Sequence, residues 1–247
     1  MAADVGPDAD ADAAVEYAAA LVLKAARCLK LGNNVACTGM SLTHRFFSRK
    51  SVREWDVRVI ARACLYLAAK LEERPKPLRE VVPVFDRLER RRAQRANPEA
   101  LLDFGGDEYA RLRRETVDAE RAVLCEFGFL LHVEHPHKLA ISYLRVLELP
   151  HLMQLAWNCC NDSLRTPVCV QFPANVVACG CLAFAAARAK VCLPTDPPWW
   201  LLFVDGHDEH AGVLSVVDQL RALHRRGAPS LPASAQLAPR APALPSR

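Results

Sequence analysis

Residues 59–69 read VIARACLYLAA, and residues 176–186 read VVACGCLAFAA. The two segments are identical at six of their eleven positions, and both are rich in alanine. Each segment has apolar residues in the spacing of a buried helix face. Small residues let neighbouring helices approach closely, so each segment predicts a helix at the centre of its own helical unit. An internal repeat of this kind favours two similar units in one chain.

The sequence around the two segments predicts further helices, so that each copy is third in a run of about five. Gly32 and Gly128 are expected to end helices, because glycine tolerates the left-handed backbone. A loop over 93–107 and a boundary between the units near 130–134 complete the predicted all-α fold. The predicted helices span residues 12–31, 34–48, 54–71, 78–91, 108–127, 136–148, 151–165, 174–191 and 209–226.

Composition narrows the classes of protein to which the chain belongs. Half of the 247 residues are hydrophobic and only ten are glycine, which favours helices over sheets. The 32 basic and 28 acidic residues give a net charge of +4, which argues against a dedicated nucleic-acid binder. The acidic start of the chain lacks the charge and apolar order of a signal peptide, and no apolar run is long enough to span a bilayer.

The motif search predicts no catalytic, cofactor or metal site. The ten cysteines form no CxxC pair at zinc spacing, and no glycine-rich phosphate loop is present. The basic run of Arg90, Arg91, Arg92 and Arg95 is interpreted as the solvated end of a helix and its loop, with a nuclear-import or nucleic-acid patch as the alternative. Five cysteines stand in apolar stretches and are expected to be reduced and buried, namely Cys28, Cys64, Cys125, Cys179 and Cys181.

Two charges stand where apolar residues are expected. Lys70 lies at the edge of the apolar stripe Ile60–Leu71, and Glu120 lies inside the apolar arc of its helix. Such a charge is costly unless it is paired, so each has two interpretations: a member of an internal salt bridge, or a polar anchor in a protein interface. Tyr66, Lys70 and Glu73 share one helical stripe, and an aromatic residue with flanking charges is typical of an interface.

From 12 to 226 the chain resembles the cyclins, specifically the transcription-associated class, and is most similar to the L-type. The segments that carry the resemblance are LTHRFFSRKS (42–51), ACLYLAAKLEERPKPLREVVPVF (63–85), DAERAVLCEFGFLLHVEHPHK (118–138), AWNCCNDSLRT (156–166) and PPWWLLF (197–203).

The resemblance implies a tandem cyclin fold of two five-helix lobes. It implies a flexible tail over 1–10, a kinase-binding cyclin box over 11–130 and a second box over 131–226. A disordered Pro/Ala-rich tail is expected over 227–247.

It also implies a function. The chain would be a nuclear, non-catalytic subunit that activates a cyclin-dependent kinase in transcription and pre-mRNA splicing. It would bind neither a cofactor nor a small-molecule substrate. Lys70 and Glu120 match cyclin positions that contact the kinase, and Tyr66 and Glu73 match positions that do so in T-type cyclins.

Three features set limits to the resemblance. His44 stands where cell-cycle cyclins have an aspartate, and the first helix lacks their docking tryptophan. The last 21 residues do not show the Arg/Ser-rich composition of many L-type tails. The alternatives are a K- or T-type cyclin of a transcription-elongation kinase and a nucleic-acid-binding cyclin fold like transcription factor IIB. A third alternative is a cysteine enzyme, which would need a thiol of low pKa.

Overall fold

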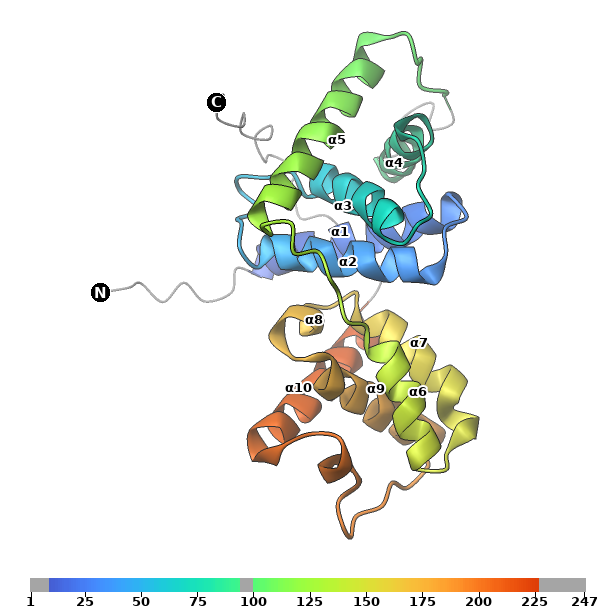
Figure 1. The fold of residues 1–247 in the computed structure, drawn as a ribbon. Coiled ribbons are helices and arrows are strands. Elements are labelled where there is room, and N and C mark those ends of the chain that lie inside the picture. Colours follow the sequence, from blue (N-terminus) through green and yellow to red (C-terminus); the bar gives the residue numbers. More distant parts are fainter. Residues whose placement is uncertain (1–8, 94–99, 227–247) are drawn as a thin grey trace, which may run out of the picture. The chain divides into compact units, whose positions relative to one another are not determined.

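The computed structural model describes residues 9–93 and 100–226, and these contain helices but no β-strand. The all-α prediction is therefore confirmed for this part of the chain. It divides into two compact units, of which the first ends at His132 and the second begins at Val133 (Figure 1). The predicted tails lie outside the described residues, except that the first helix already includes Ala9 and Asp10.

The central helix of the first unit is α3, as the alanine-rich segment predicts. It packs against all four other helices of the unit. Its alanines are fully buried, and Gly39 of α2 stands where an added Cβ would lie 3.0 Å from Val22 Cγ1 of α1. Small side chains thus allow the close packing. The helices are α1 (Ala9–Cys28), α2 (Asn33–Phe47), α3 (Val57–Leu71), α4 (Leu78–Arg92) and α5 (Asp107–Glu126).

In the second unit α9 takes the central place. It packs against α6, α7, α8 and α10, and its Gly180 lies directly against Val216 of α10. The short helix α8 and two 3-10 turns were not predicted, because they are too short to show a periodic pattern. The helices are α6 (Pro136–Val146), α7 (Met153–Ser163), α8 (Val168–Gln171), α9 (Ala174–Ala189) and α10 (Gly206–Arg225), with 3-10 turns at Pro150–Leu152 and Trp199–Leu202.

Three local predictions are wrong. Lys30 (φ 54°), and not Gly32, takes the left-handed conformation after the first helix, and Gly32 is instead the N-cap residue of α2. Cys28 and Cys125 are exposed, whereas Cys64, Cys179 and Cys181 are buried as expected. Leu71 is 40% exposed, because it is the last residue of α3 and the chain turns away there.

Candidate functional site

The helices α3 and α5 bring the two predicted charges together. Lys70 Nζ lies 2.6 Å from Glu120 Oε1. The Glu120 side chain is 11% exposed, whereas that of Lys70 is 41% exposed, so the pair has one buried and one open member. The interpretation as an internal salt bridge is thus what the first unit shows. The open side of the pair leaves Lys70 accessible to a partner.

Tyr66 completes the environment of Lys70. The ammonium nitrogen lies 4.0 Å from the centre of the Tyr66 ring, one helical turn earlier on α3. A cation over the face of an aromatic ring is stabilised by the ring's quadrupole. Lys70 is therefore held between a carboxylate and a ring before any partner binds.

Glu73 does not continue the helical stripe that the sequence predicts. α3 ends at Leu71, and Glu73 follows in the left-handed conformation with φ 55°. Its N–H donates to the carbonyl of Lys70, and Arg74 N donates to Ala69 O. This hydrogen-bond pattern is a Schellman helix end. Glu73 is exposed beside the pair and has no side-chain partner among the described residues.

The neighbouring Glu72 has a structural role that the sequence analysis missed. Its carboxylate accepts hydrogen bonds from Thr38 Oγ1 at 2.7 Å and from Asn34 Nδ2 at 2.8 Å. The end of α3 is thereby tied to α2. No local pattern reveals this contact, because the partners stand more than 30 residues earlier in the chain.

A buried arginine sets the packing of α3 on α5. Arg62 is 5% exposed, and its Nε donates to Thr116 Oγ1 at 2.6 Å. Its Nη2 lies 3.6 Å from a carboxylate oxygen of Glu115 and donates to Leu112 O. Burial lowers the pKa of the Arg62 guanidinium, and Glu115 partly offsets this. These bonds position the two helices two turns before the Lys70–Glu120 pair.

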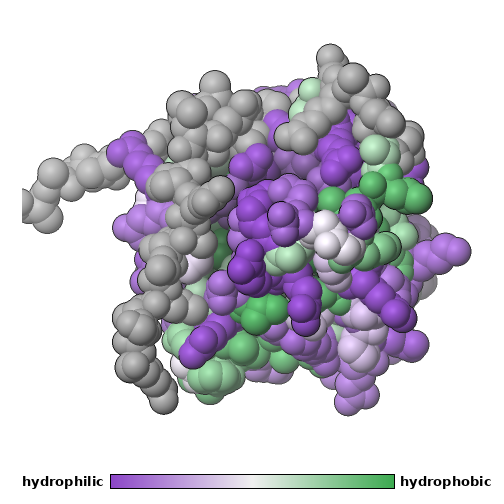
Figure 2. Space-filling model, turned by 90° about the horizontal axis from the view of Figure 1, so that it is seen from above, coloured by the Kyte–Doolittle hydropathy of each residue, from purple (hydrophilic) through white to green (hydrophobic). Residues whose placement is uncertain are grey.

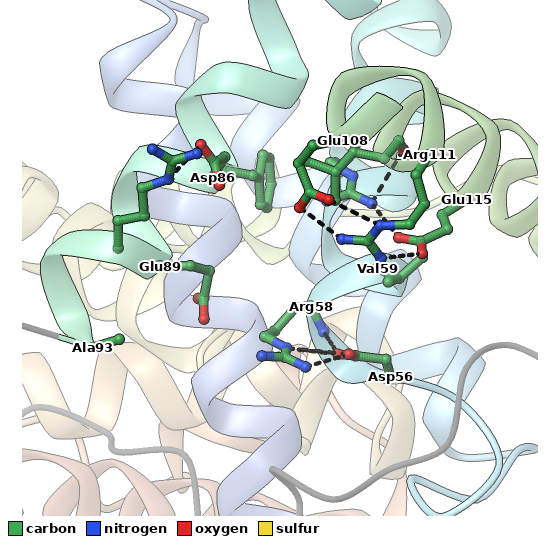
Figure 3. Close-up of a pocket in the computed structure, with 13 residues that line it drawn as sticks. Asp56, Arg58, Val59, Asp86, Glu89, Ala93, Glu108, Arg111 and Glu115 are labelled. Carbon is green, nitrogen blue, oxygen red and sulfur yellow. Dashed lines mark hydrogen bonds and ion pairs between the residues drawn. The ribbon is translucent and has the colours of Figure 1, made fainter. Parts of the chain in front are cut away.

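Next to Arg62, a pocket of about 200 Å³ opens between α3, α4 and α5 (Figure 3). Most of its charged side chains are paired within their own helix. Arg58 binds the N-cap residue Asp56 of α3, Arg90 binds Asp86 in α4, and Arg111 bridges Glu108 and Glu115 in α5. These paired charges offer no nucleophile with an adjacent base.

Exposed apolar side chains stand on the same two helices as the pair. Leu71 directly follows Lys70, and Val117, 43% exposed, lies one turn before Glu120. Beyond the end of α5, Phe129 and Leu130 are 68% and 77% exposed. Apolar residues around a few charges are typical of a protein interface. None of these four residues is predicted from the sequence to belong to the site.

The segment that carries Phe129 and Leu130 is held in place by α2. Arg45 donates to the carbonyls of Leu130 and His132 at 3.2 and 3.1 Å. Its guanidinium also lies 4.8 Å from the centre of the Phe127 ring. The exposed apolar residues therefore belong to an anchored segment, which is suited to a preorganised contact.

The cysteines do not form a reactive centre in the described part of the chain. All ten cysteines carry a thiol, and none of them forms a disulfide bond in the described part of the chain. Burial is the main cause that raises the pKa of four of them to about 12, namely Cys37, Cys64, Cys159 and Cys179. A thiol of high pKa carries almost no thiolate at neutral pH, which is the opposite of a catalytic cysteine. No group of three potential metal ligands occurs among the described residues, and no helix there can cross a membrane.

Comparison with known proteins identifies this arrangement. The family model described as "Cyclin, N-terminal domain" matches residues 14–132. The chain is 46% identical over 188 residues to "Cyclin-L1-1" of Arabidopsis thaliana, covering 76% of this chain and 45% of that protein. It is 41% identical over 192 residues to "Cyclin-L1" of Homo sapiens, covering 76% and 36%. The chain thus spans less than half the length of these relatives.

The fold also matches a solved structure, the yeast RNA Pol II CTD kinase CTDK-1 complex. The TM-score is 0.65 at 17% identity, covering 83% of this chain and 64% of the matched chain. The agreement in fold, together with the L-type relatives, accords with the resemblance read from the sequence. The chain belongs to the cyclin family, and L-type cyclins are among its relatives.

Proposed function

We propose that the chain is the regulatory subunit of a cyclin-dependent kinase that acts in transcription and pre-mRNA splicing in the nucleus. Family membership and the L-type relatives support this role. A solved complex with the same fold is a kinase of the RNA polymerase II C-terminal domain. The observation that carries the proposal is the Lys70–Glu120 pair, which is half open to solvent and stands among exposed apolar residues.

The proposed kinase-binding surface consists of Tyr66, Lys70, Glu73 and Glu120, extended by the exposed apolar residues Leu71, Phe129 and Leu130. Lys70 offers N–H donors at its open side, and Glu73 adds an exposed carboxylate next to it. Leu71 supplies apolar area that a partner helix can bury. A contact of this composition provides both affinity and orientation.

The proposed mechanism is allosteric, and the chain itself performs no chemistry. Binding would favour the kinase state in which the regulatory helix and the activation loop hold the catalytic ion pair and the magnesium ligands in place. The chain shifts that equilibrium because it binds the active state more tightly than the inactive one.

A charge-swap experiment separates an interface role of the pair from a purely internal one. The tagged chain is purified from native extract as wild type, Lys70→Glu, Glu120→Lys and the double swap, and captured kinases are identified by mass spectrometry. Each single change places like charges together, whereas the double swap restores an internal salt bridge of reversed polarity. Thermal unfolding of each variant reports the internal bridge independently.

The double swap is expected to recover thermal stability but not kinase capture. Mispairing of an interfacial charge costs about 2–5 kcal/mol, or roughly 30-fold or more in affinity. The control Asp218→Lys breaks the exposed pair with Arg221 in the second unit and should leave capture unchanged. Recovery of capture by the double swap would show an internal role only. Absence of any kinase with the wild type would overturn the proposed function.

A further inference from the structure

The outer face of α5 carries arginines that the proposed function does not use. All four basic residues of this helix are arginine, and none is lysine. Arg111 is paired with Glu108 and Glu115. Arg113, Arg114 and Arg121 are exposed, and no partner for them exists among the described residues. Elsewhere in the first unit Arg58, Arg62 and Arg90 are all bound to carboxylates, as shown above.

The helix geometry aligns these side chains. Arg114 and Arg121 are separated by seven residues, which places them two turns and about 11 Å apart on one stripe. Val117, 43% exposed, lies between them. Asp118 is the one carboxylate in this stretch of the face. In the view of Figure 2, hydrophilic side chains cover most of the coloured surface, and hydrophobic areas lie among them.

We propose that this face of α5 binds a segment of a partner protein that is rich in aspartate and glutamate. The planar guanidinium matches a carboxylate with two parallel hydrogen bonds, which lysine does not provide. Val117 offers an apolar contact between the two charged ends of the stripe. Arginine beside exposed apolar area is a composition enriched at protein interfaces.

Nucleic acid fits the same face less well. Single-stranded nucleic acid is bound by a basic groove together with aromatic residues that stack on the bases. The one aromatic residue of α5, Tyr109, packs edge-on against Phe104, with ring centres 5.2 Å apart. Between Arg114 and Arg121 the face has an exposed valine but no aromatic side chain on which a base could stack. The composition of this face therefore favours a protein segment.

Binding is tested with the purified full chain by fluorescence polarisation. The probe is a fluorescein-labelled poly-glutamate peptide, and poly-glutamine of equal length is the neutral control. The test variant is Arg114→Glu with Arg121→Glu. The matched control is Arg145→Glu with Arg225→Glu, which makes the same change in net charge at exposed, unpartnered arginines of the second unit. A milder variant, Arg114→Gln with Arg121→Gln, guards against misfolding, and thermal unfolding is recorded for each.

Poly-glutamate should bind the wild type, and its affinity should fall as the salt concentration rises. Affinity should fall at least about tenfold in the α5 variant and stay unchanged in the control variant. Equal losses in both variants, or equal binding of poly-glutamine, would overturn the proposal. The proposal would also be overturned if poly-uridylate RNA bound the wild type more tightly than poly-glutamate and the α5 variant abolished that RNA binding. The kinase-capture test does not alter these arginines, so either proposal can fail alone.

Discussion

Glu120 and Lys70 form one salt bridge but differ in exposure. The carboxylate is 11% exposed and the ammonium group's side chain is 41% exposed. Removal of Lys70 leaves a buried carboxylate without its cation. Removal of the negative charge of Glu120 leaves a cation that still reaches water and the Tyr66 ring. The two deletions should therefore differ in cost, although they break the same bond.

Lys70→Met should lower the free energy of unfolding by about 1–3 kcal/mol, because an uncompensated buried carboxylate pays its full desolvation cost. Glu120→Gln should lower it by less than about 1 kcal/mol, as for an exposed ion pair. Urea unfolding of the two variants at neutral pH measures both values. Equal losses, or a larger loss for Glu120→Gln, would show that the carboxylate is better solvated than its burial indicates.

His137 is expected to make the stability of the second unit depend on pH. Burial lowers its pKa below the usual value, and a hydrogen bond between Nε2 and Asn161 Oδ1 at 2.9 Å partly offsets this. The unfolded chain then binds more protons than the native one below about pH 6.5, so stability decreases as the pH falls through this range.

The measurement is the thermal midpoint between about pH 7.5 and pH 5. The wild type should lose more stability than His137→Gln over this range. The control His151→Gln, at an exposed histidine of the same unit, should behave as the wild type. If the thermal midpoints of all three proteins fell equally with pH, His137 would not be the cause of the pH dependence.

At the scale of helices, the two copies of the repeat differ in how closely a neighbouring helix approaches them. Gly180 of α9 occupies the position of Ala63 in α3. A Cβ added at Gly180 would lie 2.5 Å from Val216 Cγ1 and 2.6 Å from Val216 Cβ. α10 is therefore closer to α9 than an alanine at this position permits.

Gly180→Ala should destabilise the chain by about 1–3 kcal/mol, the usual cost of overpacking a core. The loss should shrink when Val216→Ala is added, because the clashing methyl groups are then removed. Gly105→Ala is the control, since its nearest neighbour would be Asp103 Oδ1 at 3.6 Å. Chemical denaturation measures all of these variants. If the stability losses of Gly180→Ala and Val216→Ala simply add in the double variant, the proposed clash between these two residues is wrong.

The ends of the helices show how well the positions of glycines in the sequence predict where a helix stops. Gly128 has φ 55° and ends α5 as predicted. Lys30, Glu73, Glu148 and Lys190 also take the left-handed conformation after helices, although none is a glycine. In each case backbone hydrogen bonds close the helix end and hold the residue there. A rule based on glycine alone therefore predicts the end of α5 at Gly128 correctly but places the end of α1 at Gly32 instead of Lys30.

At the scale of the whole molecule, the ten thiols report how the chain is packed. Three are exposed, Cys169 is half-buried and the remaining six are buried. The exposed thiols Cys28, Cys125 and Cys192 should react quickly with Ellman's reagent in the native protein, and Cys169 more slowly. The buried six should react only after denaturation, because burial limits access and raises the pKa of four of them. Fast reaction of all ten would mean that the helical units are not packed as described.

The pattern of apolar residues predicts the longer helices, the internal repeat predicts two units, and the interrupted apolar faces single out Lys70 and Glu120. Apolar spacing encodes helices because one face of each must be buried, and Lys70 and Glu120 stand out because they interrupt such faces. The packing of the helices in space shows what the pattern does not: the two charges meet, Glu72 binds α2, and Leu71, Cys28 and Cys125 are exposed. The physical reason is that pairing and exposure depend on how helices distant in sequence pack, and the local pattern of one helix carries no information about its neighbours.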